Sequence, residues 1–173
     1  MSATTSNIED KKFSNILVAI DGSEHSLRAA EYALSLAKTF EAELTAVTVS
    51  YVPASEDLSQ LDVLRQSLVE DNSDYTKDAE KWFERFIQYA KESNVQLNTE
   101  LLNSTKPVDY VILEYAEEKK IDLIVVGTRG RTGFKKLLLG SVASSIVTYS
   151  HCPVLVINSD QKKCSLEKEL LSV

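Results

Sequence analysis

The sequence has 173 residues, 43% hydrophobic and 26% charged, and its 19 basic and 26 acidic side chains give a net charge of −7. This length and composition fit one globular domain and exclude collagen-like, disordered and disulfide-stapled classes. The acidic balance argues against a nucleic-acid partner. No apolar stretch reaches the ~18 residues of a membrane span. The polar first ten residues lack the apolar core of a secretion signal, so we expect a cytoplasmic protein with two reduced cysteines and no metal site.

Five short apolar segments predict β-strands. Four are nearly continuous apolar runs, which are typical of strands covered on both faces in a parallel sheet. The other segment alternates apolar with polar residues, as expected for a half-exposed edge strand. The continuous runs span residues 16–20, 44–49, 121–126 and 154–157, and the alternating segment spans residues 95–101.

Helical periodicity fills the intervals between these strands. One apolar stripe runs from Leu27 to Ala37, with Ser23 as the expected N-cap, and the clearest stripe runs over residues 79–90. Trp82 belongs to that second stripe, so we expect it in the core rather than in a cofactor cage. Two further helices are predicted, one over residues 108–115 after Pro107 and one over residues 141–149. Strands alternating with helices indicate an α/β fold, an open parallel five-stranded sheet with right-handed crossovers and helices on both faces.

Three segments fall outside this scheme. Residues 53–75 form a long insertion after the second strand, and their helically spaced leucines leave open a short extra helix or a lid over the carboxyl ends of the strands. Residues 1–11 and 159–173 are predicted to be tails that flank a single domain of residues 12–158, the first of them flexible.

A glycine-rich segment follows the fourth predicted strand. Four of the five glycines lie between Gly127 and Gly140. Such a loop lets backbone N–H groups approach an anion closely. The helix that follows starts near Ser141, and its free N–H groups and positive dipole end favour phosphate. Ser141 adds a hydroxyl donor and is itself a possible N-cap.

The charge pattern of this segment supports phosphate binding. No acidic residue occurs between Asp122 and Asp160, whereas Arg129, Arg131, Lys135 and Lys136 are basic. An acid-free basic loop in an acidic protein suits an anionic ligand. The alternative interpretation is a tight turn with a solvated basic face.

The loop matches none of the most familiar phosphate-binding motifs. GxxxxGK[ST] is absent, which excludes a P-loop NTPase, and no GxGxxG follows the first strand. The segment after the first strand, residues 20–24, is acidic, unlike the phosphate loop of a flavodoxin.

The spacing Gly127-x2-Gly130-x9-Gly140-Ser141, with VAIDGSEHS after the first strand and HCPVLVI at the end, resembles the ATP-binding branch of the universal stress protein family. The resemblance covers roughly residues 12–158. It implies the strand order 3-2-1-4-5, which opens a crevice at the carboxyl ends of strands 1 and 4.

The resemblance also implies roles for individual residues. Asp21 would accept a hydrogen bond from the adenosine, and Val49 would hold the adenine edge through backbone groups. The other implied contacts are Ala19 and Ile20 along the adenosine, Gly127 and Arg129 at the ribose and phosphates, and Gly130, Gly140, Ser141 and Val142 at the phosphate chain. For Asp21, a plain turn or helix-cap role stays open.

The family commonly dimerises by antiparallel pairing of its fifth strands. Here residues 154–157 form an apolar run at that edge, and a homodimer would cover it. The alternative is that the chain after Asn158 folds back over the edge.

Three function classes remain, and the third of them is a structural dimer that binds no nucleotide. The first is an ATP-binding stress or signalling module, with Mg²⁺ possible beside the nucleotide and an unknown protein partner. The second is a slow ATPase of the same fold. Hydrolysis needs a positioned base or a metal-bound water, and no Asp, Glu or His occurs over residues 123–150. Binding is therefore favoured over catalysis, and ATP is not distinguished firmly from AMP or cyclic AMP.

Overall fold

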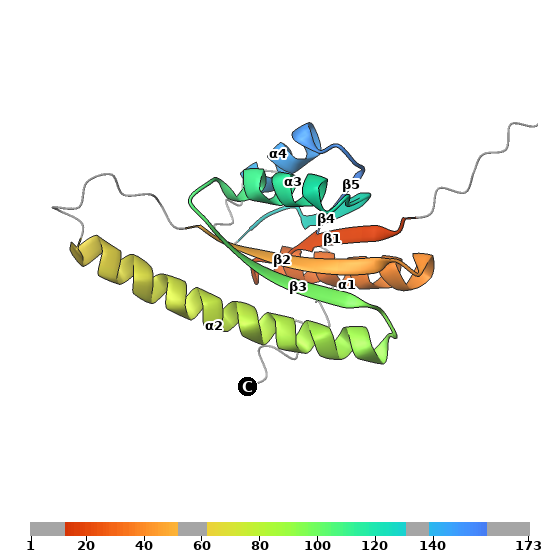
Figure 1. Ribbon diagram of the computed structural model, residues 1–173, viewed down its shortest axis with the longest axis horizontal. Coiled ribbons are helices and arrows are strands. Elements are labelled where there is room, and N and C mark those ends of the chain that lie inside the picture. The colour runs from red at the N-terminus through yellow and green to blue at the C-terminus, as the bar shows by residue number, and fades with distance from the viewer. Residues whose placement is uncertain (1–12, 52–61, 131–138, 159–173) are drawn as a thin grey trace, which may run out of the picture.

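Strands and helices alternate along the chain in a computed structural model that describes residues 13–51, 62–130 and 139–158 (Figure 1). The elements are β1 (Asn15–Ala19), α1 (Glu24–Phe40), β2 (Glu43–Tyr51), α2 (Asp62–Glu92), β3 (Leu97–Ser104), α3 (Val108–Glu118), β4 (Leu123–Gly127), α4 (Ser141–Tyr149) and β5 (Val154–Ile157). The two predicted tails and residues 53–61 of the predicted insertion lie outside the described residues.

The five strands form one parallel sheet in the order β3-β2-β1-β4-β5, which confirms the predicted fold class and strand order. The chain moves outward from β1 to β2 and β3, then returns to add β4 on the other side of β1. Within that central pair, Ile16 lies opposite Leu123 and Val18 opposite Val125. The point where the direction reverses, between β1 and β4, is where open α/β sheets bind ligands.

Two helices cover each face of the sheet. Helices α1 and α2 lie on one face, and α3 and α4 lie on the other (Figure 1). Because side chains alternate along a strand, Ile16 and Val18 pack toward α1 and α2, whereas Leu17 packs toward α3 and α4. All three are fully buried. The near-continuous apolar runs of the central strands follow from this double coverage.

The start of α1 confirms the predicted cap. Ser23 is the N-cap residue, with extended φ and ψ of −69° and 153°, and its Oγ accepts a hydrogen bond from the Ser26 backbone N–H at 3.2 Å. Such a cap satisfies one of the free donors of the first helical turn. It also fixes the direction in which the chain leaves β1.

Of the two alternatives left open for residues 53–75, the helix is correct for residues 62–75, but it is not a separate short helix. Residues 62–75 belong to α2, which continues without a break through the predicted 79–90 stripe to Glu92. The apolar stripe lapses in the polar stretch before Lys77, but residues 62–92 contain neither glycine nor proline, so nothing interrupts the helix.

Smaller differences concern element ends. β3 begins at Leu97 and extends to Ser104, three residues beyond the predicted strand, because it pairs with β2 along its whole length. Its exposure alternates, as expected for a sheet edge. α4 has the predicted bounds, but Gly140 rather than Ser141 is its N-cap residue, since Gly140 has the extended ψ of 162° and Ser141 is already helical.

Candidate functional site

A pocket of about 270 Å³ opens at the carboxyl ends of β1 and β4. It brings together all ten residues predicted from the sequence: Ala19, Ile20, Asp21, Val49, Gly127, Arg129, Gly130, Gly140, Ser141 and Val142. Their individual roles toward a ligand stay predictions. The pocket also contains residues that the sequence analysis did not assign to it: Ser26, Val47, Val108, Ile112, Val126, Thr128 and Ala143.

One side of the pocket is apolar. Val47 and Val49 come from β2, Val126 from β4, and Val108 and Ile112 from the first turns of α3. These aliphatic side chains form a surface suited to the flat, weakly polar face of a heteroaromatic ring. Val108 and Ile112 are four residues apart and therefore share a helix face. Their periodicity was visible in the sequence, but it indicated only a core stripe.

The other side of the pocket is polar and rich in backbone groups. Gly130 and Gly140 flank the opening, and the Gly140 N–H donates to the Thr128 carbonyl at 2.7 Å, which ties the end of the glycine loop back to its start. Helix α4 begins here without a side-chain cap hydrogen bond, so its N-terminus and the exposed Ser141 face the pocket. A helix N-terminus that faces a pocket favours an anionic group.

Asp21 sits in a tight turn directly after β1. Its Oδ1 accepts hydrogen bonds from the Ser23 backbone N–H at 3.0 Å and from the Ser23 Oγ at 2.6 Å. Its own backbone N–H donates to the buried Ser26 Oγ at 3.2 Å. A Cβ built on Gly130 would lie 2.7 Å from Asp21 Oδ2. The carboxylate thus stabilises the turn through Oδ1, and its Oδ2 lies toward Gly130. Asp21 therefore has the turn role that the sequence left open, and it also lines the pocket.

The two loops of the pocket are joined to each other. His25 Nδ1 and Thr128 Oγ1 are 3.0 Å apart in a hydrogen bond that links residues 103 positions apart. A Cβ on Gly127 would lie 2.6 Å from the His25 carbonyl carbon, so only glycine lets β4 approach α1 this closely. Ser23 Oγ also lies 3.4 Å from the Arg129 carbonyl oxygen. These contacts hold the β1 and β4 loops in register, and nothing local in the sequence indicated them.

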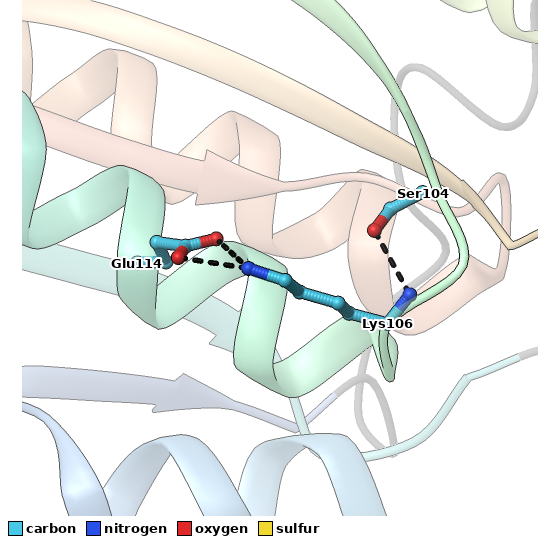
Figure 2. A network of polar contacts seen from close by, with 3 residues as sticks. All are labelled: Ser104, Lys106 and Glu114. Carbon is cyan, nitrogen blue, oxygen red and sulfur yellow. Dashed lines mark hydrogen bonds and ion pairs between the residues drawn. The ribbon is translucent and has the colours of Figure 1, made fainter.

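Lys106 precedes the pocket-lining Val108 by two residues, and its charge is engaged by Glu114. Figure 2 shows its side chain running beside α3 to Glu114, whose two carboxylate oxygens are 2.9 and 3.0 Å from Nζ. The Lys106 backbone N–H donates to the Ser104 Oγ at 3.0 Å. The hydrogen bond with Glu114 raises the pKa of Lys106. Among the described residues that line the pocket, the cationic side chain is therefore Arg129.

A second depression, between α3 and α4, has the opposite character. Its lining consists of three carboxylates, two tyrosines, a leucine and a serine: Asp109, Tyr110, Leu113, Glu114, Glu117, Ser145 and Tyr149. Ser145 Oγ donates to Asp109 Oδ2 at 2.5 Å. The three carboxylates make this surface unfavourable for a phosphate.

The pocket offers little for acid–base or metal chemistry. Asp21 is the one carboxylate among its described lining residues. The described part of the chain holds no cluster of three or more His, Cys, Asp or Glu side chains that could bind a metal ion. His151 Nε2 lies 3.0 Å from the Ile121 carbonyl oxygen, and burial raises the pKa of the neighbouring Cys152 thiol, which disfavours the reactive thiolate. Within the described ranges no helix is long and apolar enough to cross a membrane.

The fold and pocket define a doubly wound α/β protein with a pocket at its switch point, and comparison with known proteins supplies the family. The model of the universal stress protein family matches residues 12–158, and the chain belongs to this family. It is 36% identical over 154 residues to universal stress protein MJ0531 of Methanocaldococcus jannaschii, covering 87% of this chain and 85% of that protein.

Solved structures agree with this assignment. Universal stress protein UspA from Lactobacillus plantarum is 28% identical, with a TM-score of 0.71 over 84% of this chain and 98% of the other. A universal stress protein whose crystal structure was solved in complex with cAMP is 27% identical, with a TM-score of 0.63 over 86% of this chain and 99% of the other.

Proposed function

We propose that this universal stress protein binds ATP in the β1–β4 pocket and acts as a nucleotide-dependent stress or signalling module. One observation carries the proposal: an apolar surface and an anion-favouring helix N-terminus meet in one pocket, the two halves that an adenine nucleotide needs. A relative of this fold was crystallised with cAMP, which supports an adenine nucleotide as the ligand class.

ATP is preferred over the monophosphates because of the loop between β4 and α4. Its glycine pattern provides backbone donors, and the segment between Asp122 and Asp160 contains basic residues and no acidic ones. A chain of three phosphates gains more than a single phosphate from a segment of this composition. Mg²⁺ would enter with the polyphosphate, and Asp21 is the carboxylate in the pocket that could approach it.

Binding rather than hydrolysis is the proposed activity. Oδ1 of Asp21 is held by Ser23, and no second carboxylate or histidine lines the described part of the pocket to activate water. Slow ATP hydrolysis at the same site is the alternative activity.

A homodimer through β5 completes the proposal. β5 is an edge of the sheet, and its apolar residues Val154, Leu155 and Val156 are only half-buried. An apolar edge strand with free backbone groups favours pairing with a second strand. Antiparallel pairing of two β5 strands would continue the sheet across a twofold axis.

Thermal unfolding with and without nucleotide tests the ligand. At 100 times its dissociation constant a ligand adds ~2.7 kcal/mol to the free energy of unfolding, a shift of several degrees for a chain of this size. We expect Mg²⁺–ATP to raise the midpoint more than AMP, cAMP or GTP at equal concentration. A midpoint unmoved by all four, in protein shown to be free of copurified nucleotide, would contradict the proposal. A larger rise of the midpoint with AMP or cAMP than with ATP would identify that monophosphate as the preferred ligand.

A further inference from the structure

Trp82, the single tryptophan of the chain, packs directly against the turn that carries Asp21. A Cβ built on Gly22 would lie 2.0 Å from Cζ2 of the indole and 2.3 Å from Cη2. Trp82 comes from the second half of α2, and this helix lies on the face of the sheet opposite α3 and α4 (Figure 1). It does not line the pocket itself. The indole therefore covers the turn from outside the ligand site.

The turn needs such support. Gly22 has a φ of +77°, a region that glycine enters without a steric penalty, and glycine has the most backbone freedom to lose on ordering. On one side of Gly22 is Asp21, whose Oδ1 accepts from the Ser23 backbone N–H and Oγ. On the other is Ser23, the N-cap of α1. Movement of Gly22 would shift both the carboxylate and the cap.

We propose that Trp82 is a positioning residue for the pocket: its indole holds Gly22 in place and thereby fixes the Asp21 carboxylate toward Gly130. The inference rests on the proposed function for its ligand, whereas the contact between indole and turn does not depend on any ligand. The same contact would couple α2 to the pocket. A perturbation that shifts this helix would change nucleotide affinity, and bound nucleotide would in turn stabilise the helix.

The matched control is Tyr89, seven residues further along α2. Two helical turns, about 10 Å, separate it from Trp82 on a similar face. It packs against the same core cluster as Trp82. Trp82→Leu and Tyr89→Leu both replace an aromatic ring by leucine in that core. Trp82→Phe keeps an aromatic ring against Gly22 and serves as the conservative variant.

The first measurement uses the ligand-free protein. We follow amide hydrogen exchange at Asp21 and Ser23 by NMR in the wild type and the three variants. Trp82→Leu is expected to speed exchange at both amides by about tenfold, equivalent to about 1.4 kcal/mol. Trp82→Phe should give a smaller increase, and Tyr89→Leu should leave these two amides near their wild-type rates. Equal exchange in Trp82→Leu and Tyr89→Leu would overturn the inference.

The second measurement is ATP affinity by titration calorimetry, with the emission of Trp82 recorded in the wild type. Trp82→Leu should raise the dissociation constant by about tenfold, Trp82→Phe should restore part of the affinity, and Tyr89→Leu should keep wild-type affinity. Saturating ATP should change the emission of the indole. Wild-type affinity in folded Trp82→Leu would overturn the inference. A wild type that binds no nucleotide would instead refute the proposed function, and the exchange rates would still decide the role of Trp82.

Discussion

At position 130, a side chain would meet the Asp21 carboxylate. A Cβ there would lie 2.7 Å from Asp21 Oδ2, closer than van der Waals contact allows. Gly130→Val would push Asp21 aside and fill the space where a phosphate would approach. We expect this variant to lose measurable ATP binding in titration calorimetry.

A suitable control is Thr148→Val, an exposed position near the end of α4 that does not line the pocket. It introduces the same residue type, valine, at a distance from the site. ATP affinity should match that of the wild type in this variant. Unchanged ATP affinity in Gly130→Val would show that Gly130 does not contact the nucleotide.

Ser141 gives a graded version of the same test. Its exposed side chain stands at the first helical position of α4 and lines the pocket. If its hydroxyl donates to a charged phosphate, Ser141→Ala should weaken ATP binding by roughly 1.5–3 kcal/mol. Ser144→Ala, one turn further along α4 and also exposed, is the matched control. Equal affinities of the two variants would mean that the hydroxyl has no phosphate contact.

The sequence could predict those site residues whose role follows from their own residue type and from their spacing along the chain. Gly130 and Gly140 are recognisable because only glycine lets backbone N–H groups come this close to an anion, and their spacing resembles the family pattern. The contact between His25 and Thr128 could not be predicted, since each side chain is ordinary in its own segment. Only the fold makes them neighbours.

At the scale of elements, Asp122 joins the two strands that form the pocket. Its carboxylate accepts from the Ser14 backbone N–H at 2.8 Å and from the Asn15 backbone N–H at 3.1 Å, just before β1 and at its first residue. These bonds lie at the amino end of β1 and β4, away from the pocket. Asp122→Ala should therefore lower the free energy of unfolding by about 1.5 kcal/mol, because two bonds to a charged, partly exposed acceptor are lost.

Denaturant unfolding measures that loss, and ATP calorimetry provides the contrast. Affinity should stay within about twofold of the wild type, since distant sites are usually independent. Glu118→Ala, an exposed acidic residue at the end of α3, controls for the change in net charge. If Asp122→Ala is as stable as Glu118→Ala, the two hydrogen bonds contribute nothing to the sheet.

The elements themselves were largely predictable, and the exception has a physical reason. Buried strands and short capped helices have strong signals, such as the apolar run of β4 and the Ser23 cap of α1. The first half of α2 has a weak signal, because residues 70–76 are mostly polar and the apolar stripe lapses there. The absence of glycine and proline over residues 62–92 was a signal for one continuous helix that the sequence prediction did not use.

The arrangement of the whole molecule could not be predicted from local patterns. Alternating strands and helices indicate a parallel sheet but not the order of its strands. The resemblance to the family supplied the order, and the order places the β1 turn beside the β4 loop. The pocket is a consequence of that order, because a chain that added β4 beyond β3 would separate Asp21 from Gly130.

In the described part of the chain β5 pairs with β4 alone, and its other edge allows a specific test of the proposed dimer. The Pro153 carbonyl accepts from the Ile124 N–H at 3.0 Å, and the Ile157 carbonyl accepts from the Thr128 N–H at 2.8 Å. Backbone groups alternate in direction along a strand, so the odd-numbered residues of β5 bond to β4 and Val156 directs its N–H outward. Proline is tolerated in an edge strand at such an outward position.

Val156→Pro should therefore keep the β4–β5 pairing and remove a donor needed for pairing with a second β5. We expect the wild type to sediment as a dimer and Val156→Pro as a folded monomer in analytical ultracentrifugation. Val156→Thr keeps the β-branched shape and the N–H, so it should remain a dimer. A dimeric Val156→Pro would exclude antiparallel β5 pairing as the interface. A wild type that is monomeric at every concentration tested would show that β5 does not pair with a second copy of the chain.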